Sequence, residues 1–385
     1  MATEGPFLAA IIARLPDPTV NLAAYGVAFA LAILIEAPVI MLMSASTSLV
    51  RDRVTYLKLR NFARFLGVAT TGLLLAVLIP SVYRWLTGTV LGLPPEVADL
   101  TYGALWFFLP WPAAIAYRRF LQGVLIRAGK TRLVAWGTLI RLFGMVIAAL
   151  AGFFVLDLPG AWVGGLALGT GVTVEAIAAR FMAASSVRDL LEGKGDLEAR
   201  GRNVTYRDIA KFYFPLALTS FIGLSIQPLL TFFMGRSIAP LESLAVFPVV
   251  HALSFFFRSM GLALQDTAIA LMGERFTHLP ELKKFALGLG LATSTGLALV
   301  AFTPLSRLWF ETVSGLTSEL ASFALTPTQV IVPLPFLAVL LSLQRAILVE
   351  GRKTHYITVA SALEVGCVAV LFILLGFRLD LVGAT

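Results

Sequence analysis

Long apolar stretches, bounded by charged residues or by Pro and Gly, occupy most of the chain. Ten of them are long enough to cross a membrane, since a spanning helix needs about 20 apolar residues, and Pro6–Leu15 is a shorter one. They lack the strict alternation of apolar and polar residues that is typical of strands, so we predict an all-α polytopic membrane protein. The ten stretches are Leu22–Leu49, Phe62–Leu86, Leu100–Ile126, Leu133–Leu156, Ala161–Val187, Phe212–Met234, Leu244–Met272, Phe285–Phe310, Leu320–Val349 and Ile357–Phe377.

Basic residues outside these stretches gather in alternate loops. If Pro6–Leu15 is counted as the first stretch, the loops after the even-numbered stretches are the basic ones. Lys and Arg are enriched in cytoplasmic loops of membrane proteins, so we predict that the even-numbered loops are cytoplasmic in a multi-pass protein of the cell inner (plasma) membrane. The opposite side holds Arg14, Arg84, Arg236, Arg307 and Arg378.

The composition supports this class and excludes others. Of the 385 residues, 58% are hydrophobic and 14% are charged, whereas a soluble domain carries about 25% charged residues. The net charge of +8 follows from the basic loops, so we expect no nucleic acid partner. The single cysteine, Cys367, and three scattered histidines (His251, His278, His355) offer no metal site and no catalytic set. We therefore expect no cofactor, no metal and no enzymatic activity.

The two halves of the chain resemble each other. At an offset of 222 residues, Pro6 matches Pro228 and Arg14 matches Arg236. From the third stretch onward the offset is 223, and matching pairs then continue almost to the end of the chain. They include Thr89 with Thr312, Gly92 with Gly315, Pro110 with Pro333, Pro112 with Pro335 and Lys130 with Lys353. One nearly constant offset over most of the chain indicates an internal repeat.

The repeat predicts the architecture. Each half begins and ends on sides that require an even number of helices, so the repeats are parallel and related by an axis along the membrane normal. We expect a six-plus-six arrangement with an N-lobe (residues 1–190), a cytoplasmic linker (191–207) and a C-lobe (208–385). By this alignment the chain is truncated in helix 1 and lacks helix 12, and a natural ten-helix variant is the alternative.

Several passages resemble the multidrug/oligosaccharidyl-lipid/polysaccharide (MOP) flippases. "FYFPLALTSFIGLSIQPLLTFFMGRS" (Phe212–Ser237) is similar to the opening helix of a MATE-type lobe. "LQGVLIRAGKTRLVAWGTLIRL" (Leu121–Leu142) and "QRAILVEGRKTHYITVASALEV" (Gln344–Val365) are similar to a later helix–loop–helix passage of that group. "AAYGVAFAL", "FYFPLAL" and "FPVVH" most resemble bacterial relatives of the progressive ankylosis proteins.

Ionisable residues inside a membrane span are costly and usually face a cavity or a partner. Glu36 and Arg258 lie in the middle of two stretches and are equivalent by the 222-residue offset. The resemblance implies that their helices line a central cleft. Arg258 is then a candidate for binding an anionic substrate, with Glu36 as its counter-charge or as a proton carrier. The alternative is a permanent ion pair that locks the lobes.

Further candidates lie nearby in the same or other stretches. Arg119 and Arg345 either extend to the membrane interface or form a basic vestibule, and the same alternatives hold for Arg118. His251 is either titratable or a buried structural residue, and Gln227 is a cleft candidate. Asp266 either is a second candidate for ion coupling besides Glu36 or pairs with a basic loop residue. We expect structural roles for Glu175 and Arg180. Arg141 and Glu364 are a second pair of repeat equivalents, and we expect each of them to pair with a residue of its own lobe.

These features predict a secondary transporter or exporter that moves organic or phosphate-bearing anions by alternating access, as the resemblance implies. The alternatives are cation-coupled multidrug efflux of the MATE type and a flippase for a lipid-linked saccharide. The expected partners are a small anionic or amphiphilic substrate, the lipid bilayer and a coupling H⁺ or Na⁺. We expect a monomer.

Overall fold

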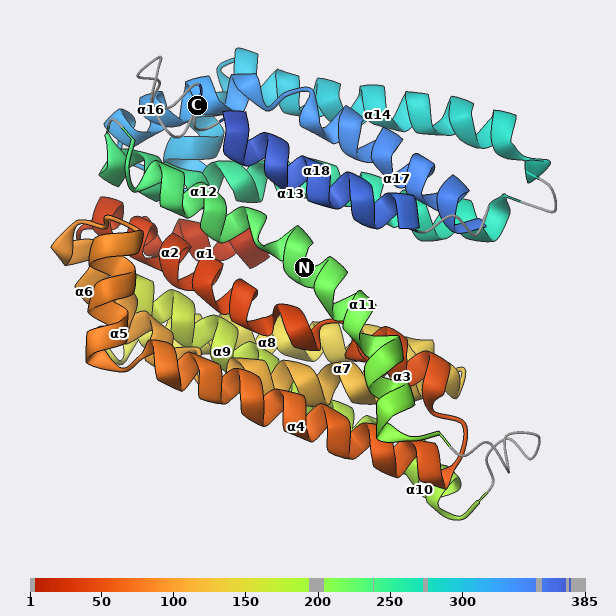
Figure 1. Cartoon of the computed structure of the whole chain (residues 1–385). Coiled ribbons are helices and arrows are strands. Elements are labelled where there is room, and N and C mark those ends of the chain that lie inside the picture. The colour runs from red at the N-terminus through yellow and green to blue at the C-terminus, as the bar shows by residue number, and fades with distance from the viewer. Residues whose placement is uncertain are drawn as a thin grey trace. The chain divides into compact units, whose positions relative to one another are not determined.

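The protein is an assembly of α-helices (Figure 1). The computed structural model describes residues 4–193, 204–237, 239–272, 276–350, 355–371 and 374, and these residues contain no strand. The expectation of an all-α polytopic fold is therefore confirmed. The helices are α1 (Glu4–Ile12), α2 (Pro18–Glu36), η1 (Ala37–Val39), α3 (Leu42–Leu49), α4 (Arg53–Val77), α5 (Pro80–Arg84), η2 (Trp85–Val90), α6 (Pro95–Phe107), α7 (Trp111–Arg127), α8 (Thr131–Phe154), α9 (Gly160–Met182), α10 (Ala184–Leu191), α11 (Tyr206–Leu224), α12 (Ile226–Met234), α13 (Pro240–Leu271), α14 (Leu279–Phe302), α15 (Leu305–Arg307), η5 (Leu308–Val313), α16 (Ser318–Val330), α17 (Leu334–Glu350) and α18 (His355–Leu371).

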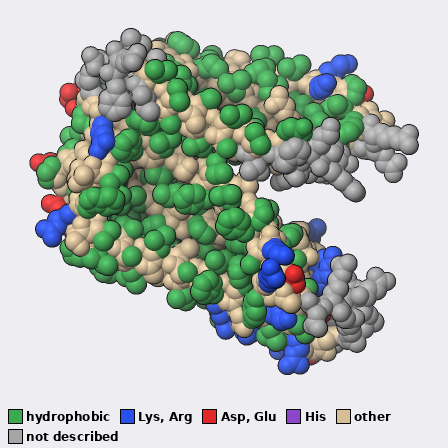
Figure 2. All heavy atoms as spheres, in the orientation of Figure 1, with side chains coloured by type: hydrophobic (Ala, Val, Ile, Leu, Met, Phe, Trp, Pro, Cys, Tyr) green, Lys and Arg blue, Asp and Glu red, His purple; other side chains and the backbone are tan. Residues whose placement is uncertain are grey.

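Six helical segments of the described residues are long and apolar enough to cross a membrane, and the number rises to eight if each of two bent helix pairs counts as one span. The bends are 69° between Arg53–Val77 and Pro80–Val90, and 41° between Ser318–Val330 and Leu334–Leu348. The space-filling view shows many hydrophobic side chains across the visible surface, as a membrane protein requires, and Lys and Arg side chains gathered toward the left and right of the view (Figure 2).

Proline breaks several of the predicted stretches. The stretch Leu100–Ile126, predicted as one continuous span, is divided into α6 and α7 by a turn at Phe108–Pro110, so that prediction is wrong in detail. Pro110 and Pro112 lack the backbone N–H that would continue the helical hydrogen bonds. Of the equivalent pair, Pro333 lies in the break between α16 and α17, where the bend is 41°, and Pro335 lies in the first turn of α17. The recurring Pro-x-Pro motif therefore lies at a helix break in both halves.

Contacts divide the chain into two compact units, Val27–Phe232 and a unit made of Met1–Gly26 with Phe233–Thr385. In the Val27–Phe232 unit, α7 packs against α3, α4 and α9, and α9 also packs against α6 and α8. Glycines allow these close approaches. A Cβ added at Gly123 of α7 would lie 2.4 Å from the carbonyl oxygen of Met43, and one at Gly169 of α9 would lie 2.3 Å from that of Phe107.

The other unit is built around α13, which packs against α14, α16, α17 and the N-terminal helix α1. One of its hydrophobic clusters joins α13, α14 and α17. A Cβ added at Gly261 of α13 would lie 2.9 Å from the side chain of Val339 on α17, so these two helices are in close contact. The lobe boundaries at residues 190 and 208 stay a prediction.

The internal repeat recurs in backbone geometry. Both halves contain a six-residue π-helix, η2 (Trp85–Val90) and η5 (Leu308–Val313), at an offset of 223 residues. Each is followed by a glycine with positive φ, +66° at Gly92 and +73° at Gly315, which a residue with a side chain adopts only with strain. Leu91 N donates to Leu86 O at 2.8 Å, and Ser314 N to Trp309 O at 2.7 Å. The same unusual turn is thus present at equivalent places.

Candidate functional site

Helix α7 carries polar side chains into the interior of the Val27–Phe232 unit. The helix begins after Pro110 with Pro112 in its first turn, where the missing N–H costs no helical hydrogen bond. Arg118 and Gln122 lie four residues apart and therefore share one face of the helix. Both are buried, with 4% of their surface exposed, so Arg118 does not extend to the membrane interface.

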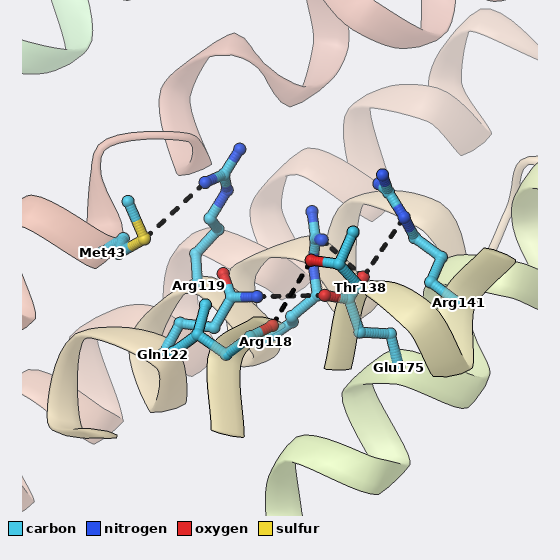
Figure 3. Close-up of polar contacts among 8 residues, drawn as sticks. Met43, Arg118, Arg119, Gln122, Thr138, Arg141 and Glu175 are labelled. Carbon is cyan, nitrogen blue, oxygen red and sulfur yellow. Dashed lines mark hydrogen bonds and ion pairs between the residues drawn. The ribbon is translucent and has the colours of Figure 1, made fainter. Parts of the chain in front are cut away.

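Glu175 of α9 is the centre of this cluster (Figure 3). Its side chain is fully buried. Arg118 Nη1 donates to Glu175 Oε2 at 2.5 Å, and Gln122 Nε2 donates to Glu175 Oε1 at 3.0 Å. Arg141 of α8 completes the cluster, with its Nε 3.5 Å from Glu175 Oε2. One carboxylate therefore serves two buried guanidinium groups.

The close approach of α8 and α9 places Arg141 there. A Cβ added at Gly171 would lie 3.0 Å from the carbonyl oxygen of Arg141, which is tighter than most contacts of a side chain, so glycine favours this close approach. Glu175 follows Gly171 by one helical turn and points to the same neighbouring helix. The pairing of Arg141 within its own half was predicted, although its partner Glu175 was not identified.

Arg119 differs from the two other arginines. Its guanidinium points away from Glu175 and toward Met43 of α3 (Figure 3), with Nη1 3.8 Å from the sulfur atom. A thioether is a weak acceptor. Within the described part of the chain, Nε of Arg119 is buried and has no hydrogen-bond partner. Nε of Arg118 is likewise buried without a hydrogen-bond partner, so Arg119 differs from Arg118 in its acceptor, which is a thioether and not the Glu175 carboxylate.

Glu36 is the last residue of α2, two residues before Pro38, and is 7% exposed. The indole Nε1 of Trp111, the first residue of α7, donates a hydrogen bond to Glu36 Oε2. Arg118, Arg119 and Arg141 lie within electrostatic range of this carboxylate. The break after Glu36 is itself held in place, because the hydroxyl of Tyr213 donates to the carbonyl oxygen of Pro38. Three arginines and two glutamates therefore share this interior, which leaves it net positive.

The other predicted site residues lie elsewhere. Arg258 and His251 are half-buried on α13, and Arg345 is half-buried on α17. His251 lies between Phe247 and Phe255, with ring centroids 5.5 and 6.3 Å apart. The charge of Glu364 on α18 acts on Arg258.

Three further predictions concern Gln227, Asp266 and the pairing of Glu36 with Arg258. Gln227 is half-buried on α12, in the Val27–Phe232 unit. The side chain of Asp266 lies outside the described residues. The pairing of Glu36 with Arg258, which belong to different compact units, stays a prediction.

Sequence reasoning did not identify Gln122 and Glu175 as members of a site. A signal existed for Gln122, since it is the repeat equivalent of Arg345 at an offset of 223 residues. Among the described residues, no group of three or more His, Cys, Asp or Glu side chains could hold a metal ion.

Comparison with solved structures identifies the fold. The chain matches the inward-facing conformation of a multidrug resistance MATE family transporter of the MOP superfamily with a TM-score of 0.76, at 15% identity over 100% of this chain and 90% of that one. The fold is that of MOP superfamily transporters. It also matches the lipid II flippase MurJ in an inward closed conformation with a TM-score of 0.73, at 15% identity over 100% of this chain and 81% of that one.

A third match is the outward-facing conformation of a MATE family transporter, with a TM-score of 0.57 at 14% identity over 99% of this chain and 81% of that one. None of these matched proteins is named as an enzyme, in agreement with the sequence prediction. No protein-family model matches the chain, and no curated protein matches it. The resemblance to the progressive ankylosis proteins therefore stays a prediction.

Proposed function

We propose that the chain is a secondary transporter with a MOP fold that moves organic or phosphate-bearing anions across the inner membrane by alternating access. The observation that carries the proposal is the arginine cluster of the Val27–Phe232 unit, in which the buried Arg118 and Arg141 share Glu175 while the half-buried Arg119 has a thioether as its hydrogen-bond acceptor. The fold supports a role in transport, and the arginine cluster supports a negatively charged substrate.

Arginine suits this task. The guanidinium stays charged when it is partly desolvated, and its planar fork donates two parallel hydrogen bonds to a carboxylate or phosphate. A buried charge without a partner is costly in a membrane protein, so an arrangement that keeps an excess of arginines indicates a ligand of opposite charge. Arg119 makes the first contact, and Arg118 and Arg141 raise the local positive potential.

The carboxylates argue against a cationic substrate. Among the described residues, the buried acidic side chains are Glu36 and Glu175. Glu175 is engaged by Arg118, Gln122 and Arg141, and Glu36 accepts from Trp111. A cation would have to compete with these partners. Multidrug efflux of a cationic compound is therefore the weaker alternative.

The remaining residues keep their proposed roles. Arg258, Arg345, His251 and Gln227 are further substrate contacts, and Glu36 and Asp266 couple transport to H⁺ or Na⁺. The similarity of short passages to the progressive ankylosis group supports a small organic anion. We also propose that the protein works as a monomer, that it exports its substrate, and that its even-numbered loops lie in the cytoplasm.

Uptake into proteoliposomes tests the proposal. The purified protein should accumulate at least one of citrate, pyrophosphate or a nucleotide under an H⁺ or Na⁺ gradient, and should not accumulate cationic dyes. Charge-assisted hydrogen bonds contribute about 1.5–3 kcal/mol, so Arg119→Ala should reduce anion uptake roughly 10- to 150-fold. Arg119→Lys should retain part of it, since a Lys keeps the charge but loses the fork.

The matched control is Arg132→Ala, which removes an exposed arginine at the start of α8 and should leave uptake unchanged. Cation uptake without anion uptake would overturn the proposal, and so would full uptake by a folded Arg119→Ala protein.

A lipid-linked diphosphate is the second candidate substrate, because it carries the same anionic group and because the fold is shared with the lipid II flippase MurJ. A vesicle assay that measures movement of a fluorescent polyprenyl-diphosphate sugar between leaflets separates the two. Lipid movement without uptake of soluble anions would favour the flippase.

A further inference from the structure

The N-terminal segment and the η5 turn are joined by one side chain. Arg14, two residues after α1, donates from Nη2 to the carbonyl oxygens of Thr312 at 2.6 Å and of Val313 at 3.0 Å. Its Nη1 donates to Ala10 O of its own helix at 2.6 Å. The side chain is exposed, so packing alone does not force it into this position. Both partners belong to one compact unit, Met1–Gly26 with Phe233–Thr385.

The geometry of η5 explains why an arginine binds here. The last carbonyl groups of a helix have no partner within the helix. Two carbonyls of η5 are satisfied by the turn itself, because Ser314 N donates to Trp309 O and Leu316 N to Phe310 O. Thr312 and Val313, nearer the end, accept from Arg14 instead. A cation at a helix C-terminus is also favoured by the helix dipole.

Gly315 makes room for the arginine. A Cβ at this position would lie 3.0 Å from both Cγ and Nη1 of Arg14, closer than ordinary van der Waals contact. The backbone there has φ of +73°, which glycine adopts without cost. The absence of a side chain at Gly315 therefore allows both the positive φ of the turn and the close approach of Arg14.

We propose that Arg14 is a latch that holds the N-terminal segment on the η5 turn, and that its release is a step of the transport cycle. This inference rests on the proposed transport function. Contacts place both partners in one compact unit, but the predicted lobes divide them, with Arg14 in the N-lobe and η5 in the C-lobe. If these lobes are the parts that move in alternating access, the bonds of Arg14 have to break in each cycle. Hydrogen bonds from a side chain to two carbonyls can break and re-form without unfolding either helix.

A cysteine reporter on α1 tests the latch directly. Ala9 lies on the buried face of α1, with 1% of its surface exposed, and α1 packs against α13. In the full chain with Cys367→Ala, an Ala9→Cys sulfur should react slowly with an impermeant maleimide. Arg14→Ala should raise the labelling rate tenfold or more, which corresponds to about 1.4 kcal/mol. Arg14→Lys should give an intermediate rate, because one ammonium cannot span both carbonyls in the same way.

Two matched controls separate the latch from general loosening. Arg84 is also exposed but donates to Pro80 O of its own helix, so Arg84→Ala should not change the rate. Gly315→Ala should raise the rate by displacing Arg14. Gly129→Ala imposes similar strain, with φ of +71°, and its added Cβ meets nothing within 4 Å, so the rate should stay unchanged.

The outcomes distinguish the latch from the transport function. Equal labelling of folded Arg14→Ala and Arg84→Ala proteins would overturn the latch, even if wild-type protein transports anions. Faster labelling of Arg14→Ala and Gly315→Ala than of their control variants would support the latch. This comparison of labelling rates needs no transport substrate. Absence of anion transport by wild-type protein would count against the proposed function alone.

Discussion

Replacing Glu175 by Gln removes the negative charge between two buried arginines. Glu175 is 0% exposed, Arg118 is 4% exposed and Arg141 is 6% exposed, so water cannot compensate for the lost charge. Gln keeps the shape and one acceptor oxygen, and the change therefore isolates charge from packing. Breaking a buried ion pair by removing one partner costs about 3–5 kcal/mol. We expect a loss of stability of this size for Glu175→Gln.

The measurement is unfolding of the detergent-solubilised protein by heat or denaturant. The control is Glu96→Gln, which neutralises an exposed acid in the first turn of α6 and should leave stability unchanged. The double change Arg118→Met with Glu175→Gln should recover part of the loss, because an apolar side chain of similar volume is tolerated where the ion pair was. Stability of Glu175→Gln equal to that of wild type would refute the assigned role of Glu175.

Three other changes test the structure. Trp111→Phe should destabilise the protein by about 1–3 kcal/mol, because the buried Glu36 carboxylate loses its indole donor. Gly123→Leu should destabilise it by about 1–3 kcal/mol or more, since even a Cβ there would lie 2.4 Å from a backbone oxygen of α3; thermal unfolding measures both. In a cysteine-free background, Gly88→Cys should react with an impermeant reagent from outside intact cells, whereas Ala128→Cys should not.

Each of these predictions has a control or a contrary result. Gly72→Leu is the control for the glycine, because an added Cβ at Gly72 meets nothing within 4 Å, and equal stability of both leucine variants would contradict the close contact of α3 and α7. Unchanged stability of Trp111→Phe would show that another group satisfies Glu36. Labelling of Ala128→Cys from outside would reverse the topology.

The sequence predicted the helical class well because the relevant signal is local. Each of the ten apolar stretches contains helix in the structure, since the cost of unpaired backbone groups in lipid leaves few alternatives. The repeat further matched Pro110 with Pro333, and each lies at a break between two helices. The sequence did not predict that α6 and α7 are separate helices, because two prolines in an apolar stretch are compatible with either a kink or a break.

The candidate site was less predictable. Arg119 and Glu36 could be proposed because an ionisable residue within a span is unusual by itself. The partner of Arg118 could not, since Glu175 lies 57 residues away and spacing carries no information across that distance. Which acceptor each arginine reaches likewise depends on the packing of α3, α8 and α9 around α7.

The π-helical turns at Trp85–Val90 and Leu308–Val313 bear on the ancestry of the chain. A π-turn holds one more residue than the α-helical turn it replaces, and its presence at equivalent positions requires either two separate insertions or one inherited insertion. The accompanying glycines, Gly92 and Gly315, and the matching hydrogen bonds favour inheritance. A single insertion in a half-length ancestor, copied with it on duplication, accounts for both turns.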